Sequence, residues 1–180
     1  DYLPNRTVTD VIWETMQEVG DVSYSDDDRA FASDLKDTIS REQVTASLED
    51  VPAEFTEKIR GTSLYDAPIP PHAEGEAGGG STEVGDVSWI TPTGQFRAAT
   101  WAVGTPAHTW QATAANGDFG KKGAVYAAKV LGGTAYTLIN NPSIIKQAQE
   151  EFDEITGEQS YETPLPAGTE PPFDITGPHQ

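Results

Sequence analysis

The sequence predicts an α/β fold, in which helices pack on a mostly parallel or mixed β-sheet. Two amphipathic helical patterns open the chain, two segments rich in β-branched and aromatic residues lie in its middle, and two further helical patterns follow. The two middle segments do not alternate cleanly between apolar and polar residues, which is typical of strands buried on both faces. The length of 180 residues suits one domain, because domains commonly have roughly 100–150 residues.

The first predicted element is an amphipathic helix over residues 7–20. Apolar residues recur at helical spacing along this stretch. Thr7 or Thr9 can cap its first turn, and Gly20 can supply the left-handed residue that ends it.

A second helix is predicted to begin at Ser25, because Ser25 and Asp28 have the spacing of a capping box, with Asp in place of Glu. Residues 40–60 are mixed, and short helices are expected at 42–48 or 53–59. Residues 1–60 are therefore expected to be helical. The buried stripe of the second helix is expected to contain Ala30, Phe31, Leu35 and Ile39.

Residues 61–83 are predicted to be a connector. The prolines of residues 66–71 block regular structure. The glycines of residues 73–82 are typical of a flexible turn. They lack the Gly-Lys-Ser/Thr ending of a phosphate-binding loop, so a nucleotide site is not expected there.

Residues 84–156 are expected to hold the strands and two helices. The content of β-branched and aromatic residues predicts strands at 84–90 and 96–103, with a further short extended piece at 108–112. A long helix is predicted at 120–140, and a last one runs from Pro142 to about residue 155.

Two features of this C-terminal part depend on glycine and proline. Gly132 and Gly133 lie inside the long helix, where each costs about 1 kcal/mol unless a close neighbour needs the space. Residues 157–180 contain five prolines and are expected to form an extended tail.

Composition argues against several classes of protein. The chain has 29 Asp and Glu, 11 Lys and Arg, and a net charge of −18, whereas nucleic-acid binding requires a basic surface. An anionic membrane surface would repel such a chain, and no apolar run reaches the roughly 18 residues of a spanning helix. The absence of Cys excludes disulfides and thiolate ligands and fits a reducing compartment. We expect a cytoplasmic protein that binds neither nucleic acid nor membrane.

The acidity is concentrated at the two ends of the chain. The net charge is −13 over residues 1–84, +3 over residues 85–149 and −8 over residues 150–180. The simpler interpretation of the acidic ends is a solvated surface. The alternative is a halophilic adaptation, in which dense carboxylates keep the protein hydrated while salt screens their repulsion.

His108 and Asp86 are the residues that we expect to carry chemistry. His108 lies in residues 104–110, directly after a predicted strand, where α/β sheets place their sites; a structural histidine in a turn is the alternative. Asp86 is a lone carboxylate in an apolar segment, where a buried charge is costly unless it is paired or near a metal; a loop-facing structural Asp is the alternative. His72 and His179 lie in proline-rich surroundings and are most simply solvated.

Two separated motifs carry a resemblance to a known family. They are residues 80–89, GSTEVGDVSW, and residues 104–111, GTPAHTWQ. They resemble the C-terminal signature of the aminobenzoyl-glutamate utilization protein B group, amidohydrolases within the class of dinuclear metallopeptidases that includes aminoacylases and carboxypeptidase G. The opening residues 1–5, the helix after the histidine loop and the proline-rich residues 161–172 resemble the same group.

The resemblance implies that residues 1–180 are the C-terminal portion of a three-layer α/β/α catalytic domain. It implies a full-length enzyme with two divalent ions, zinc or manganese, that hydrolyses a small amide or peptide, an aminobenzoyl-glutamate-like or N-acyl amino-acid substrate, by metal-activated water. The general base and the other ligands are expected upstream, because the chain has no His-x-Asp and no Glu-Glu before a glycine-rich turn. The chain alone is therefore expected to be inactive, and the whole protein is expected to form a homodimer through a domain not in this chain.

The same resemblance assigns roles to individual residues. His108 matches the last metal-ligand histidine of the family, and Asp86 matches the acidic position of a motif that lines the active site. Glu83 stands where the family has Asp. The other residues expected to line the site are Ser88, Gly104, Thr105 and Trp110. The alternative is a non-catalytic binding or interaction module that retains the metallopeptidase fold.

Overall fold

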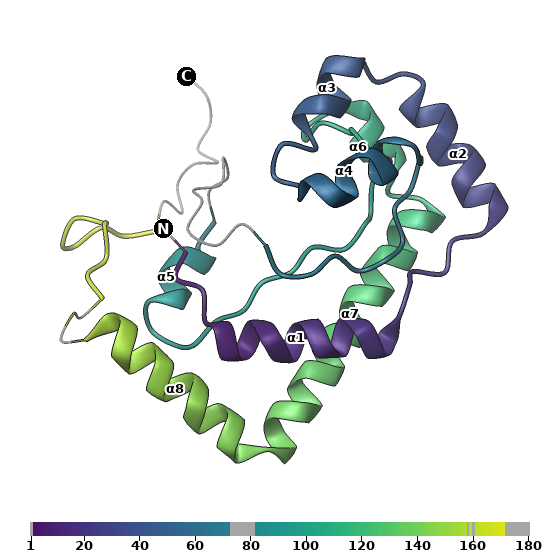
Figure 1. Ribbon diagram of the computed structural model, residues 1–180. Coiled ribbons are helices and arrows are strands. Elements are labelled where there is room, and N and C mark those ends of the chain that lie inside the picture. Colours follow the sequence, from purple (N-terminus) through teal and green to yellow (C-terminus); the bar gives the residue numbers. More distant parts are fainter. Residues whose placement is uncertain (1, 73–81, 158, 160, 172–180) are drawn as a thin grey trace, which may run out of the picture.

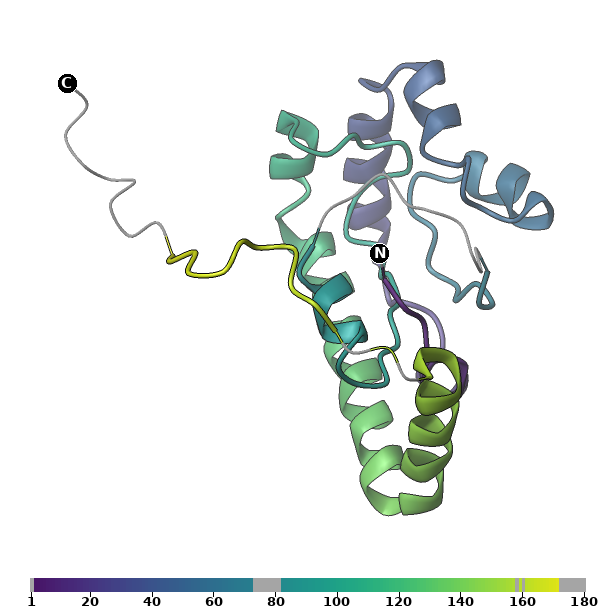
Figure 2. The same ribbon diagram turned by 90° about the vertical axis from the view of Figure 1, so that its left-hand side faces the viewer.

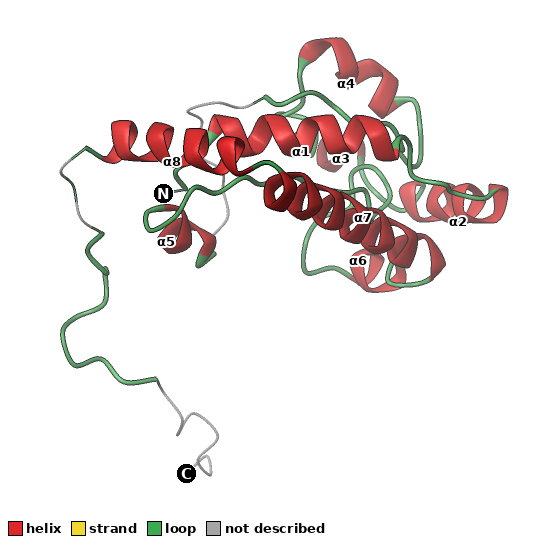
Figure 3. Cartoon of the chain, turned by 90° about the horizontal axis from the view of Figure 1, so that it is seen from below, coloured by secondary structure: helices red, strands yellow, loops and turns green. Residues whose placement is uncertain are grey.

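The computed structural model describes residues 2–72, 82–157, 159 and 161–171, and these contain eight helices joined by loops. The helices are α1 (Arg6–Val19), α2 (Asp26–Lys36), α3 (Arg41–Ala46), α4 (Ala53–Arg60), α5 (Val84–Ser88), α6 (Trp110–Ala114), α7 (Asp118–Asn140) and α8 (Pro142–Thr156). No strand occurs among the described residues, so the predicted α/β sheet fold is wrong (Figure 3). None of the helices in this part of the chain is both long enough and apolar enough to cross a membrane.

The first predicted strand, residues 84–90, is the short helix α5 and the turn that follows it. A short apolar run does not distinguish a strand from a helical turn, because Val84 and Val87 are also at helical spacing. Asp86 lies in the first turn of α5, where the helix dipole favours a carboxylate.

The second predicted strand, residues 96–103, is extended over most of its length but has no strand beside it in the described chain. A β-ladder needs such a neighbour to complete its backbone hydrogen bonds. This segment packs on helices instead. The Tyr24 hydroxyl donates to the Ala99 carbonyl, and a Cβ on Gly123 of α7 would lie 2.2 Å from the same oxygen. The piece predicted as extended at 108–112 turns into α6.

The helices predicted outside this middle region are confirmed, with differences at their caps. Both halves of the Ser25–Asp28 capping box are formed at the start of α2. The cap of α1 is Asn5, whose side chain accepts a 3.0 Å hydrogen bond from the Val8 amide, rather than Thr7 or Thr9.

The buried stripe of α2 differs in part from the expected one. Leu35 and Ile39 are buried as expected, whereas Ala30 and Phe31 are exposed. The stripe instead continues through Ala32 to Asp28. A carboxylate in this position is not expected from the sequence, because its partner Lys122 lies far along the chain in α7.

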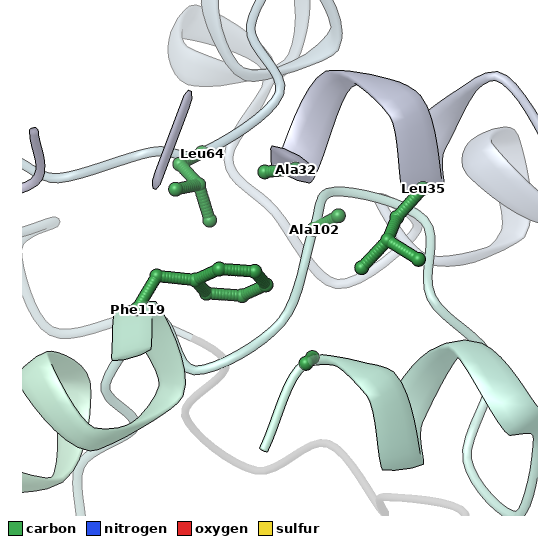
Figure 4. Packing of buried hydrophobic residues seen from close by; sticks show 6 residues of the cluster. Ala32, Leu35, Leu64, Ala102 and Phe119 are labelled. Carbon is green, nitrogen blue, oxygen red and sulfur yellow. The ribbon is translucent and has the colours of Figure 1, made fainter. Parts of the chain in front are cut away.

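The core consists of three clusters along the molecule. In one, Ile12 and Met16 of α1 pack on Tyr126 and Val130 of α7, and α1 also packs on α8 (Figure 1). In the second, Ala32 and Leu35 of α2, Phe119 of α7 and the loop residues Leu64 and Ala102 point toward one another (Figure 4). The third joins α3 and α4 through Val44, Leu48 and Ile59.

The predicted loops lack regular structure where they are described. Residues 66–71 and 161–171 contain neither helix nor strand, and Figure 2 shows the C-terminal segment leading away from the helices. The glycine-rich turn predicted at 73–82 lies outside the described residues except for Thr82, and residues 172–180 of the tail also lie outside them.

Candidate functional site

The loop before α6 holds His108 in a left-handed backbone conformation. His108 has a φ of 61°, and it is the one non-glycine residue in the described chain with a positive φ. This conformation is uncommon for a residue with a Cβ and costs of order 1–3 kcal/mol. The imidazole is exposed and lines an open hollow of about 620 Å³, together with Trp101, Thr109 and Asn116.

The rest of this loop is held by close contacts. Gly104 has a φ of 92°, and a Cβ there would lie 2.6 Å from Cγ2 of Val44, so the position requires glycine. The Thr109 hydroxyl donates to the Pro106 carbonyl at 2.8 Å. The Thr105 hydroxyl is buried and has no hydrogen-bond partner within the described residues. The loop is thus fixed on both sides of the exposed imidazole.

Trp110 directly follows this loop as the first residue of α6. Its side chain is 60% exposed, so it does not pack in the core. It does not line the hollow beside His108.

Asp86 occupies a second hollow, of about 410 Å³, beside α5. Its Oδ1 atom accepts a 2.8 Å hydrogen bond from the Tyr161 hydroxyl. This bond to a carboxylate raises the pKa of Tyr161, because the phenol must give up the bond to ionise. Trp89 and Glu162 also line this hollow.

Ser88 and Glu83 are placed differently from each other. The Ser88 side chain is fully buried; its hydroxyl donates to the Gly85 carbonyl at 2.6 Å and accepts from the Leu3 amide at 2.8 Å. Ser88 therefore holds the N-terminal segment on α5. Glu83 is exposed at the start of α5, and its carboxylate accepts from the Thr82 hydroxyl at 3.3 Å.

The structure does not bring Asp86 and His108 together. Their two hollows share no lining residue, and α5 and α6 lie apart in Figures 1 and 3. The described residues contain no group of three or more His, Asp or Glu side chains that could hold a metal ion. They therefore do not form a metal site on their own, although His108 offers one exposed imidazole as a donor.

Sequence reasoning missed Tyr161 as the partner of Asp86. The two residues are 75 positions apart, and no periodicity or spacing rule connects them. The one available signal was the resemblance of residues 161–172 to the proline-rich ending of the family.

A comparison with curated proteins finds a similar chain in a subunit of the p-aminobenzoyl-glutamate hydrolase of Escherichia coli (strain K12). The identity is 30% over 94% of this chain and 37% of that protein. The chain thus spans little more than a third of the length of the curated relative that it matches. No family model and no solved structure matches the chain. The resemblance carried by the two motifs is therefore confirmed: over nearly its whole length the chain is similar to one portion of this hydrolase protein, as expected for a C-terminal portion.

Proposed function

We propose that this chain is part of a metal-dependent amidohydrolase in which His108 supplies one metal ligand. The whole enzyme hydrolyses the amide bond of an aminobenzoyl-glutamate-like or N-acyl amino-acid substrate. The similarity to part of a p-aminobenzoyl-glutamate hydrolase supports the reaction class. The backbone of His108 carries the residue assignment, because an exposed histidine is held at a φ of 61°, and such strained positions cluster at functional sites.

The loop contributes orientation to this chemistry. When bound, a zinc or manganese ion polarises the amide carbonyl and lowers the pKa of its bound water toward about 7. A neutral imidazole is a suitable donor to such an ion. The tight contact of Gly104 with Val44 and the Thr109–Pro106 hydrogen bond fix the loop, so the ring is positioned before any ligand binds.

Asp86 has a supporting part in the proposal. It lies in a separate hollow, where Tyr161 holds its carboxylate by a hydrogen bond. We therefore assign it a fixed negative charge at the border of the site rather than a bond to the ion that His108 binds. The remaining ligands and the general base come from parts of the protein outside residues 1–180.

The proposal extends to the assembly of the whole protein. The curated relative is named as a subunit, which supports a multi-subunit enzyme, and we propose a homodimer with two metal ions per active site. A cytoplasmic location completes this proposal.

Variants of His108 in the full-length protein test the proposal. His108→Ala removes the imidazole, and His108→Asn removes it while keeping a side chain that tolerates left-handed backbone. We expect both to lose bound metal by elemental analysis and to lower kcat/KM by about 100-fold or more. His72→Ala, a change at another exposed histidine, is the matched control and keeps both. Normal metal content together with normal hydrolysis in His108→Ala would contradict the proposal.

The second candidate is a non-catalytic interaction module. The separation of Asp86 and His108 into two hollows favours it. This candidate predicts that the full-length protein, purified without chelators, contains no stoichiometric zinc or manganese. Metal content therefore separates the two candidates before any substrate is known.

A further inference from the structure

The outer face of α7 is apolar and exposed along most of the helix. Its large side chains Val125, Leu131, Tyr136 and Ile139 are 56%, 58%, 71% and 74% exposed. The opposite side of α7 packs on α1 (Figure 1). The outer α7 face is defined by Val125, Ala128, Leu131, Gly132, Tyr136 and Ile139, which helical spacing places on one side. The helix therefore has two apolar sides, and the described chain covers one of them.

The charge of this region differs from the rest of the protein. Residues 119–149 contain four lysines and no acid, in a chain with 29 Asp and Glu. Three of these lysines pair with carboxylates of this chain, namely Lys121, Lys122 and Lys146. Lys129, exposed beside the outer α7 face, has no ion-pair partner among the described residues. An exposed apolar face with a polar rim is typical of an interaction site, so this surface is suited to being covered.

Gly132 gives independent evidence for a close neighbour. Glycine is unfavourable inside a helix unless something approaches its backbone. For Gly133 the neighbour is α1, because a Cβ there would lie 2.6 Å from Cγ2 of Thr15. A Cβ on Gly132 would meet nothing within 4 Å. No contact within the described residues therefore requires Gly132, and a segment outside them supplies the missing reason.

We propose that the outer α7 face packs against a further segment of the hydrolase polypeptide, outside residues 1–180, with the closest approach at Gly132. The curated relative supplies the length for such a segment, since this chain spans 37% of it. The covering surface is apolar and presents a carboxylate or backbone carbonyl to Lys129. This inference rests on the likeness to a longer hydrolase and not on the metal role of His108.

Single cysteines test the proposal directly, because the chain has none of its own. Val125→Cys and Ile139→Cys place one thiol on the outer α7 face, and Glu154→Cys places one on the exposed side of α8 as a control. The rate of reaction with the soluble reagent DTNB is measured in the full-length protein and in the 180-residue chain. In the full-length protein we expect the two α7 thiols to react about tenfold or more slowly than the control. In the 180-residue chain we expect them to react as fast as the control.

Other occupants of the face give different results. Equal rates for the α7 and control thiols in the full-length protein overturn the proposal. Protection in the 180-residue chain that grows with its concentration assigns the face to a second copy. Protection in the full-length protein that is lost on dilution assigns it to another subunit. Either result also overturns the proposal. None of these readouts depends on metal or catalysis, so their failure is distinguishable from a failure of the proposed function.

The role of Gly132 has its own check. Gly132→Leu, added to the Ile139→Cys variant of the full-length protein, places a bulky side chain at the proposed closest approach. We expect it to raise the reactivity of the thiol about tenfold, toward that of the control. An unchanged rate would show that nothing approaches α7 at this position.

Discussion

The hydroxyl of Tyr161 donates a 2.8 Å hydrogen bond to the carboxylate of Asp86, which joins the C-terminal segment to α5. The bond ties a residue from the proline-rich segment to one of the two residues that the sequence singles out. It also raises the pKa of Tyr161 above its ordinary value of 10.0. The phenol therefore remains a protonated donor at neutral pH.

Replacing Asp86 should release this tyrosine. In Asp86→Asn we expect the pKa of Tyr161 to fall toward its ordinary value of 10.0, because the charged acceptor is lost. Ultraviolet titration of tyrosinate, compared with the same titration of Tyr161→Phe, isolates this residue among the six tyrosines. Glu170→Gln, which removes an exposed acid farther along the segment, is the control and leaves the titration unchanged. The same Tyr161 titration in Asp86→Asn and wild type would show that the bond does not form.

The pairing of Asp28 with Lys122 predicts a loss of stability in acid. The Asp28 side chain is 5% exposed and that of Lys122 is 38% exposed. The hydrogen bond from Lys122 holds the pKa of Asp28 below its ordinary value of 3.8. A carboxyl with a lowered pKa stabilises the fold above its unfolded pKa, and this contribution is lost as the pH falls through the folded pKa.

Asp28→Asn tests this pair. At pH 7 we expect the variant to lower the free energy of unfolding by about 1–2 kcal/mol, a range reduced because Lys122 is partly exposed. The difference from wild type should shrink below about pH 4 and nearly vanish once Asp28 is protonated in the folded state. Urea denaturation at a series of pH values measures it. Asp27→Asn changes an exposed acid in the same turn and should alter the free energy by less than about 0.5 kcal/mol.

The sequence allowed the helices to be predicted where the deciding signals are local. The capping box of Ser25 and Asp28 and the apolar spacing of residues 7–20 act within one or two turns, so they do not depend on the rest of the chain. Residues 84–90 and 96–103 are different, because a strand exists only if another strand pairs with it. Their composition alone does not reveal whether such a partner is present.

The candidate site was predictable to a similar extent. The position of His108 in a loop followed from the Gly and Pro residues before it. Its left-handed backbone and the close contact of Gly104 with Val44 depend on α3, which lies about 60 residues earlier in the chain. The Asp28–Lys122 pair likewise joins α2 to α7. Such contacts between distant segments are invisible to a reading of spacing and composition.

The adjacent glycines of α7 should respond in opposite directions to the same substitution. In the 180-residue chain we expect Gly132→Ala to raise the free energy of unfolding by about 0.5–1 kcal/mol, because its Cβ enters open space and alanine favours a helix. Gly133→Ala should lower it by about 1–3 kcal/mol, because its Cβ would meet Thr15 of α1 at 2.6 Å. Urea denaturation measures both. A destabilising Gly132→Ala would show that this chain already covers the outer α7 face.

The two acidic ends of the chain meet in the fold, which sharpens the halophilic interpretation into a prediction. Helix α1 comes from the N-terminal acidic region and packs on α8 from the C-terminal one (Figure 1). Like charges on neighbouring helices oppose this packing, and salt screens them because the Debye length falls from about 10 Å at 0.1 M to about 3 Å at 1 M. We therefore expect the Tm to rise by about 5 °C or more between these sodium chloride concentrations.

A charge-reduced variant separates screening of these helices from a general salt effect. Asp10→Asn combined with Glu154→Gln removes one exposed acid from each of α1 and α8. If repulsion between the two helices is the cause, the variant has a higher Tm than wild type at low salt and a smaller rise with salt. Glu42→Gln combined with Glu49→Gln removes the same charge near α3 and should keep more of the original rise. Equal salt dependence in both variants would place the effect in the overall charge, and a flat or falling Tm in the wild type would contradict a halophilic adaptation.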